Sequence, residues 1–218
     1  MAVPDDTYFG IDENGKGVYY RDVRSENNPL RRIKLLELRL RDLLIKQTNE
    51  LEVLLDGSRK VHSPFPLAII TCISIETLGQ IFYKSDNKKD EKNQSYSFVS
   101  VIKFFDKEFS RPLTKKFKES LTKRFPNDEV EKIKNFSELF YTYFRNTFIH
   151  GYKGRAVYLE EQVNTWEKGD GFLVINPNWF WRKFKETFEE HFNQLYSNKE
   201  NNNPFKISAY YYIDKLIN

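Results

Sequence analysis

The most apolar stretch of the sequence, Leu67 to Tyr83, constrains the fold more strongly than any other. It reads LAIITCISIETLGQIFY and contains one charged residue, Glu76. A segment of this length and character predicts a helix that is buried on most sides, at the centre of a domain. Its longest apolar run, Pro66 to Leu78, is interrupted by polar residues and is shorter than the ~20 residues that a bilayer-spanning helix needs.

Glu76 has two interpretations. A buried carboxylate is costly unless a cation or hydrogen-bond donors satisfy it. Glu76 therefore either faces solvent at the rim of its helix or pairs in the core with a cation, for which Arg145 is the candidate. The sequence leaves both interpretations open.

Apolar residues at steps of three and four predict the other helices. We expect them at Leu30 to Leu55, Tyr96 to Phe109, Pro112 to Phe125, from Asn127 to His150, and at Trp179 to Tyr196. Alternating residues on both sides of a run of turn formers, Asp12 to Gly17, predict an N-terminal hairpin. Two further strands are expected at Ala156 to Leu159 and Phe172 to Ile175, whereas Phe205 to Ile217 is either helical or extended.

These elements predict an all-α fold. We expect one domain over residues 1–218, with an irregular N-terminal extension at 1–28 that carries the hairpin, a helical bundle at 29–197 and a C-terminal tail at 198–218. A small β-hairpin insert follows the helix that ends at His150.

The composition bounds the function classes. Hydrophobic residues make up 39% of the chain and aromatic residues 16%, which predicts a modest core filled with large rings. A single Cys excludes an intramolecular disulfide and a thiolate metal site, and no carboxylate cluster at ligand spacing accompanies the three His, so we expect no metal. The N-terminus has no basic region followed by an apolar run, so we expect a cytoplasmic protein that does not contact a membrane.

A net charge of +4 and a pI of about 8.9 permit a phosphate-bearing partner without requiring one. Between Lys103 and Arg124, eight cations stand against three acids, with Phe residues interleaved. Arg111, Lys115 and Lys116 are the candidates for contacts with RNA phosphates. The solvated side of an ordinary amphipathic helix explains the same pattern, so both interpretations stand.

The segment Tyr141 to Tyr152, YTYFRNTFIHGY, combines an arginine, an amide, a histidine and a tyrosine inside an aromatic helix. Asn146 and His150 are one turn apart on one side of an ideal helix, whereas Arg145 lies about 140° around the helix from His150. A working site therefore needs a groove between helices or a second copy of the chain. His150 occupies the last turn, where the helix dipole favours a protonated imidazole and holds its pKa near or above neutral.

This segment, RNTFIHGY, resembles the motif of the HEPN superfamily, in which an Arg is followed after four to six residues by a His and often directly by a polar residue. The Gly151-Tyr152 extension resembles the longer form found in HEPN toxins that are paired with nucleotidyltransferase antitoxins. The helix with Glu76 is similar to the preceding core helix of such folds, which often carries an acid. The resemblance covers roughly Leu30 to Tyr152 and the helix at Trp179 to Tyr196.

The resemblance implies a metal-independent endoribonuclease that acts as a homodimer and needs no cofactor. His150 is then the general acid or base, Arg145 stabilises charge on the phosphate, and Asn146 positions both groups. Glu76 supports the site, and Tyr152 is the residue that a partner nucleotidyltransferase modifies. Attack by the ribose 2′-hydroxyl leaves a 2′,3′-cyclic phosphate.

Two other hypotheses remain. Many HEPN proteins are inactive, so the chain is alternatively a non-catalytic helical module that binds RNA or a protein partner. In the other hypothesis the motif has only a structural role: Arg145 pairs with Glu138 or Glu76, and His150 caps the last carbonyl groups of its helix.

Overall fold

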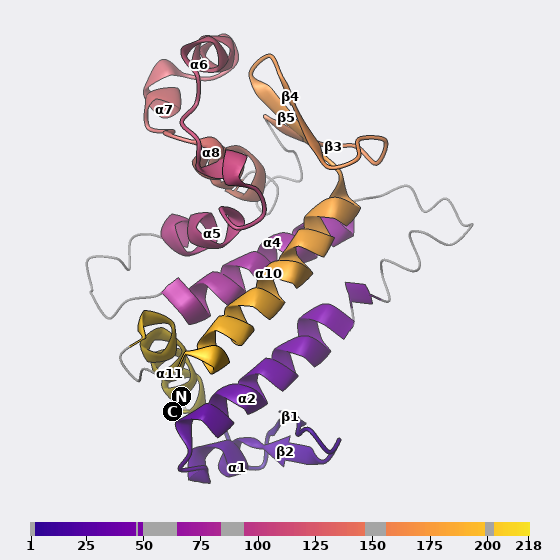
Figure 1. Ribbon diagram of the computed structural model, residues 1–218, viewed down its shortest axis with the longest axis vertical. Helices are drawn as coiled ribbons and strands as arrows, with labels where there is room; N and C mark the ends of the chain where they lie inside the picture. The colour runs from indigo at the N-terminus through magenta and orange to yellow at the C-terminus, as the bar shows by residue number, and fades with distance from the viewer. Residues whose placement is uncertain (1–2, 47, 50–64, 84–93, 147–155, 199–202) are drawn as a thin grey trace.

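A computed structural model describes residues 3–46, 48–49, 65–83, 94–146, 156–198 and 203–218 (Figure 1). Its long helices are α2 (Pro29–Leu40), α4 (Phe65–Tyr83), α10 (Pro177–Ser197) and α11 (Pro204–Ile217). α10 and α11 both pack against α4, and α11 also packs against α2. The prediction that Leu67 to Tyr83 is a central buried helix is confirmed, because α4 is covered by α5 (Gln94–Ile102), α10 and α11.

A second group of elements lies beyond α5 in Figure 1. It contains the 3-10 helix η3 (Lys107–Ser110), α6 (Lys115–Thr122), α7 (Asn127–Glu131) and α8 (Phe136–Phe140), beside a three-stranded sheet. Aromatic rings join this group to the long helices. Phe140 contacts the rings of Phe98, Phe109, Phe144 and Phe180, with centroids 4.6–6.2 Å apart. One continuous aromatic core therefore connects the two groups of helices.

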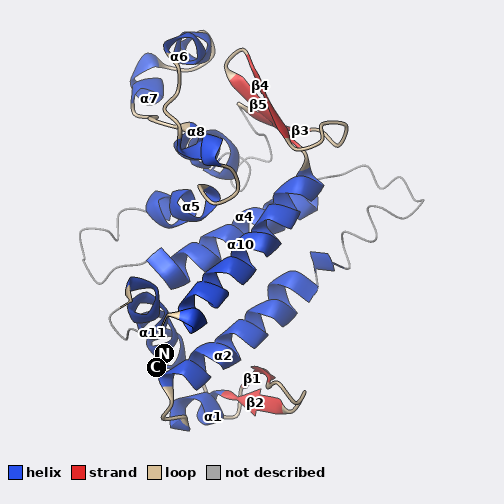
Figure 2. Ribbon diagram, viewed as in Figure 1, coloured by secondary structure: helices blue, strands red, loops and turns tan. Residues whose placement is uncertain are grey.

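The expectation of an all-α fold was wrong, because the helices are accompanied by two small sheets (Figure 2). In the first, β1 (Tyr8–Ile11) and β2 (Gly17–Tyr19) form the predicted N-terminal hairpin, which leads into α1 (Tyr20–Ser25). The second has the order β3-β5-β4, with β3 (Val157–Leu159) parallel and β4 (Trp166–Gly169) antiparallel to β5 (Phe172–Ile175). The predicted β-hairpin insert is therefore a mixed three-stranded sheet.

Strand β4 was not predicted, because its sequence WEKG contains only one strong strand former. Tertiary contacts hold it in place. Nε1 of Trp166 donates to Oδ2 of Asp106 at 3.1 Å, and Nζ of Lys168 donates to Glu108 at 2.8 Å while lying 4.6 Å from the centroid of the Phe136 ring. The strand is thus fixed by η3 and α8 and not by its own propensity.

The continuous helix expected from Asn127 to His150 was also wrong, because the chain breaks between α7 and α8. At the break, the N–H of Leu113 donates to the carbonyl oxygen of Lys134 at 3.0 Å, and the side chain of Asn135 caps α8 through the N–H of Glu138. α8 continues into a π-helical turn, η4 (Tyr141–Arg145). The helix expected at Leu30 to Leu55 similarly passes into a π-helical segment, η1 (Arg41–Lys46), and its last residues lie outside the described part of the chain.

Three helices begin with the same dipeptide, an Asn followed by a Pro. The side chains of Asn28, Asn176 and Asn203 each accept a hydrogen bond from a backbone N–H in the first turn of α2, α10 and α11. Pro at the first helical position has no N–H to leave unsatisfied and a φ that suits a helix. The segment Phe205 to Ile217, for which the sequence left a helical and an extended conformation open, is helical, and its helix begins with this dipeptide.

Within the described residues, α4 is the one helix that is long and apolar enough to cross a membrane by length and composition. Its most apolar window is 56% buried inside the protein, and its contacts with α5, α10 and α11 account for that composition.

A buried carboxylate joins α2 to α10. Glu37, 2% exposed, accepts hydrogen bonds from Nζ of Lys34 at 2.8 Å, from Nε of Arg41 at 2.8 Å and from the hydroxyl of Tyr196 at 2.7 Å. Burial alone raises the pKa of Glu37, but these three donors outweigh it and hold the pKa below its ordinary value. Arg41 also pairs with Glu189 of α10, so this side of the bundle is held by a charge network.

The two ends of the described chain meet at Arg24 in α1. Its Nη2 donates to the carbonyl oxygen of Val3 at 2.6 Å, its Nη1 donates to Asp5, and its Nε donates to the carbonyl oxygen of Ile217 at the end of α11. Figure 1 shows the N and C labels side by side at this place.

Candidate functional site

Arg145 and Glu76 form an ion pair between η4 and the middle of α4. Nε of Arg145 donates to Oε2 of Glu76 at 3.1 Å, and Nη2 donates to the same oxygen. The two side chains are 11% and 15% exposed, so water is excluded from most of the contact. Glu76 therefore does not face solvent at the rim of its helix but pairs with Arg145, the second of the two interpretations of the sequence. Glu138, the other acid considered for Arg145, instead accepts from the N–H of Lys134 at 2.7 Å.

Asn146 and Tyr141 complete the surroundings of the guanidinium group. Nη1 of Arg145 donates to Oδ1 of Asn146 at 2.9 Å, and Cζ lies 5.5 Å from the centroid of the Tyr141 ring, within cation–π distance. A guanidinium group carries five N–H donors. These hydrogen bonds use three of them, so two donors remain without a partner among the described residues.

The π-helical turn η4 places Tyr141 and Asn146 next to this pair. The N–H of Asn146 donates to the carbonyl oxygen of Tyr141, five residues earlier. Single π-helical turns occur frequently at functional sites. Because such a turn holds an extra residue, the rows of side chains drawn from an ideal α-helix, such as Leu139–Tyr143–Asn146, do not continue unchanged across it.

Cys72 lies one turn before Glu76 on α4 and is fully buried. Burial raises the pKa of its thiol far above the ordinary value; the charge of Arg145 opposes this shift and the charge of Glu76 adds to it. The thiol is therefore protonated at neutral pH and acts as a small apolar side chain beside the ion pair.

The structure brings together Glu76, Arg145 and Asn146, three of the predicted site residues. His150 and Tyr152, which the motif also requires, lie outside the described residues. Tyr141 was not predicted as part of the site, although its position four residues before Arg145 is the spacing at which a helix brings a ring and a cation together.

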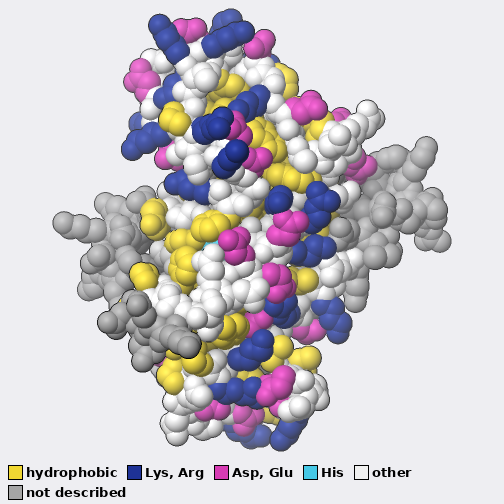
Figure 3. Space-filling model, viewed as in Figure 1, with side chains coloured by type: hydrophobic (Ala, Val, Ile, Leu, Met, Phe, Trp, Pro, Cys, Tyr) yellow, Lys and Arg dark blue, Asp and Glu magenta, His cyan; other side chains and the backbone are white. Residues whose placement is uncertain are grey.

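The candidate RNA-binding residues lie apart from the ion pair, on the group of elements that contains η3 and α6. Figure 3 shows Lys and Arg side chains there, interspersed with Asp and Glu. Arg111 pairs with Glu108, and Lys115 approaches Glu119 at 4.0 Å. Lys116 makes no ion pair with a carboxylate in the described part of the chain. The surface is thus basic but partly neutralised by its own acids.

Comparison of the chain with protein-family models, with curated proteins and with solved structures gives no match. The functional argument therefore depends on the chemistry of this site and on the motif that contains it.

Proposed function

We propose that the protein is a HEPN-like, metal-independent endoribonuclease of the toxin or defence type, which acts on cytoplasmic RNA as a homodimer. The observation that carries this proposal is the shielded ion pair between Arg145 and Glu76, at one end of the segment RNTFIH. A free arginine loses rotamer entropy when it binds a phosphate, whereas one that is already held by a carboxylate and an amide loses little.

In this mechanism the ribose 2′-hydroxyl attacks the adjacent phosphorus atom and the O5′ atom leaves. The products carry a 2′,3′-cyclic phosphate and a 5′-hydroxyl. His150 accepts the proton of the 2′-hydroxyl or donates one to the leaving oxygen, and water takes part in the other of these two proton transfers. The two remaining N–H donors of Arg145 stabilise the charge that develops on a non-bridging phosphate oxygen. Glu76 and Asn146 hold the guanidinium in position and do not take part in proton transfer.

On an ideal α-helix Arg145 and His150 do not lie together, so a working site needs a groove between helices or a second copy of the chain, and the homodimer is the second of these. In the toxin branch of the proposal, a partner nucleotidyltransferase controls the protein by modifying Tyr152. A small nucleotidyltransferase encoded by the neighbouring gene is the simplest observation that favours this branch over a stand-alone defence nuclease.

A non-catalytic helical module is the second candidate, and the burial of Arg145 favours it. The residue is 9% exposed, and Glu76 neutralises its charge, so a phosphate gains less from it than from a free guanidinium. In that case the protein binds RNA through Arg111, Lys115 and Lys116, or binds a protein partner, and the ion pair has a structural role.

The test is RNA cleavage by the purified protein in EDTA. Wild type should yield fragments with 2′,3′-cyclic phosphate ends, and His150→Ala should yield none. Glu76→Gln should reduce the cleavage rate by about 100-fold, because a small displacement of a positioning group costs about that much. Glu138→Gln is the matched control, since it changes an acid of the same segment that does not touch Arg145.

Equal cleavage by wild type and His150→Ala contradicts the mechanism, as does the absence of cleavage on every RNA tested. Salt-dependent RNA binding without cleavage supports the non-catalytic module instead.

A further inference from the structure

A buried histidine, His191 in α10, holds a cluster of rings at the end of α4 that is remote in sequence from the motif. Its Nδ1 lies 2.8 Å from the carbonyl oxygen of Thr187, and its Nε2 lies 2.8 Å from the hydroxyl oxygen of Tyr83. A carbonyl oxygen only accepts, so Nδ1 carries the proton and Nε2 accepts from Tyr83. Burial lowers the pKa of His191 to about 4, so the imidazole is neutral at physiological pH and its orientation is fixed.

Three phenylalanines contact this imidazole; Phe82 is buried, and the other two reach the surface. The ring centroids of Phe104 and Phe205 lie 4.8 and 5.6 Å from that of His191. Phe104 is 41% exposed and stands in the turn after α5, where polar residues or Gly are usual. Phe205 is the second residue of α11 and is further held by Tyr83, with ring centroids 5.5 Å apart. The rings are therefore rigid and partly open to solvent.

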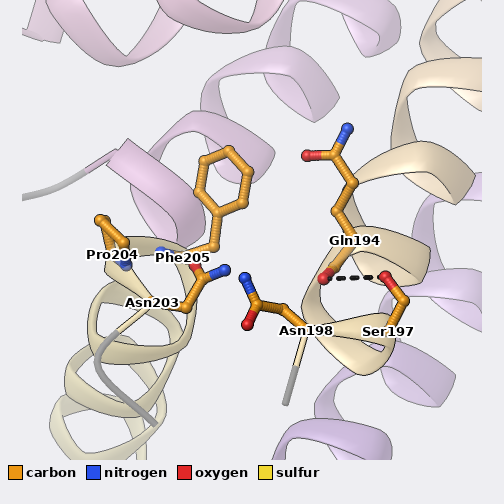
Figure 4. A pocket seen from close by; sticks show the side chains of 6 residues that line it. All are labelled: Gln194, Ser197, Asn198, Asn203, Pro204 and Phe205. Atoms are coloured by element: carbon orange, nitrogen blue, oxygen red, sulfur yellow. Dashed lines mark hydrogen bonds between the residues drawn. The ribbon is translucent and has the colours of Figure 1, made fainter. Parts of the chain in front are cut away.

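A hollow of about 440 Å³ opens beside Phe205, between the end of α10 and the start of α11 (Figure 4). Gln194, Ser197, Asn198, Asn203 and Pro204 also line it. The volume lies within the range of roughly 300–1,000 Å³ that is usual for small-molecule sites. Figure 4 shows the carboxamides of Asn198 and Asn203 facing each other across it, with the ring of Phe205 above them.

Hydrogen bonds fix the polarity of two lining groups. Oδ1 of Asn203 accepts from the N–H of Phe205 at 2.8 Å, so the Nδ2 donor of Asn203 points into the hollow. Nε2 of Gln194 donates to Glu190 at 3.2 Å, which leaves Oε1 of Gln194 as an acceptor. The hollow thus presents a donor, an acceptor and an aromatic ring, the combination that recognises the edge and face of an unpaired nucleobase.

Charge near the exposed ring suits the backbone of a nucleic acid. Lys103 and Lys107 lie on either side of Phe104 in the sequence, and both are exposed. Neither makes an ion pair with a carboxylate of the residues that the structure describes. Cations that alternate with stacking rings are the usual arrangement for single-stranded nucleic acid.

We propose that the hollow beside Phe205 binds an unpaired base of single-stranded RNA, with the neighbouring base stacked on Phe104 and the phosphates held by Lys103 and Lys107. This inference rests on the proposed function, because it names the part of the RNA substrate that the protein holds away from Arg145. It assigns RNA recognition to the end of α10 and the start of α11, in addition to Arg111, Lys115 and Lys116.

The test is fluorescence anisotropy with a labelled 12-nucleotide single-stranded RNA, in EDTA, with His150→Ala as the background so that no cleavage occurs. Phe104→Leu keeps an apolar side chain against His191 but removes the stacking ring, and Gln194→Ala removes the acceptor. Phe104→Leu should weaken binding by roughly 5- to 150-fold, the effect of losing one base–aromatic stack. Gln194→Ala should weaken binding by roughly 2- to 13-fold, the effect of losing one hydrogen bond. Tyr8→Leu, which removes a ring that is 51% exposed on β1, is the matched control and should bind as the background does.

A second probe separates bases from charge. An RNA of the same length with abasic positions keeps every phosphate but loses both bases of the proposed site, so it should bind the background variant at least as weakly as the intact RNA binds Phe104→Leu. Unchanged binding of the intact RNA by Phe104→Leu and Gln194→Ala overturns the inference, as does equal binding of the abasic RNA. Cleavage by protein with wild-type His150 is assayed separately, so the proposed nuclease can stand when this site fails, and this site can stand when no cleavage is found.

Discussion

Replacing Glu76 with Gln tests the ion pair on which the proposed site depends. The change keeps the size of the side chain and removes its charge, so the guanidinium of Arg145 loses its counter-charge in a place that is 11% exposed. Breaking a buried pair by removing one partner costs about 3–5 kcal/mol, and the residual exposure of both side chains sets the expected loss near the lower end, about 3 kcal/mol. For a chain of this length that corresponds to a fall in Tm of roughly 6–12 °C.

The double variant Glu76→Gln/Arg145→Met should recover part of this loss, because it removes both charges and leaves no unpaired charge buried. Urea denaturation of the wild type, both single variants and the double variant gives the coupling free energy, which we expect to be at least about 2 kcal/mol. Glu138→Gln, measured alongside, should lose less than about 1 kcal/mol. A coupling below about 0.5 kcal/mol refutes the reasoning, since the two side chains then act independently.

Three further predictions concern stability. Between pH 6.5 and about 4 the unfolded chain binds a proton at His191 that the folded chain does not. The free energy of unfolding should therefore fall by up to about 3 kcal/mol as the pH is lowered through this window. Urea titrations should show a smaller fall for His191→Phe, and an equal fall of the free energy with pH in both proteins contradicts the assignment. The positive φ at position 171 (+72°) and at position 15 (+76°) favours glycine at both places. A Cβ added at Gly171 would meet the backbone of Ser120 at 2.8 Å, whereas one added at Gly15 would meet nothing within 4 Å. Thermal unfolding should therefore show a loss of about 1 kcal/mol for Gly15→Ala and at least about 1 kcal/mol more for Gly171→Ala, and equal losses contradict this. A Cβ at Gly79 meets a backbone oxygen of α5 at 2.4 Å, so Gly79→Ala should force α4 and α5 apart and cost about 1–3 kcal/mol in the same assay; a neutral substitution is the contrary result.

The elements that depend on their own sequence could be predicted. α4 is continuously apolar and α10 carries a stripe of Phe residues, so both are found close to the expected boundaries. The N-terminal hairpin turn was expected from Asp12 and Asn14, and Oδ1 of Asp12 accepts from the N–H groups of Asn14 and Lys16 at 2.9 Å. Such local hydrogen bonds are set by residues a few positions apart.

The break between α7 and α8 could not be predicted in this way. Ile133 and Phe136 continue the buried stripe across it, since a residue is buried by its neighbours in space whether or not the helix is continuous. The break is fixed by Leu113, which is distant in sequence and bonds to Lys134. The prediction of the three-stranded sheet was incomplete for the same reason, because β4 is held in place by η3 and α8, which are distant from it in sequence.

The candidate site was predicted in part. Arg145 and Asn146 were singled out by their motif, and Glu76 was recognised as a carboxylate in need of a partner. Which of two arrangements Glu76 adopts depends on how α4 and η4 pack, and periodicity carries no information on that packing. The π-helical turn further displaces the side chains from the rows of an ideal helix. His191 was not singled out, because a histidine among Phe184, Phe188 and Phe192 has the pattern of a core residue.

The hydrogen bonds of Arg24 with both ends of the described chain affect the order in which parts of the protein become folded during synthesis. The hydrogen bond from Arg24 to the carbonyl oxygen of Ile217 spans 193 residues, and Arg32 of α2 reaches Asp214 in the same way at 3.0 Å. The ribosome makes α1 and α2 early, yet α11 packs against them only after it has been translated. Until then the apolar side of α2 is open to chaperones, so the earliest part of this chain is among the last to become protected.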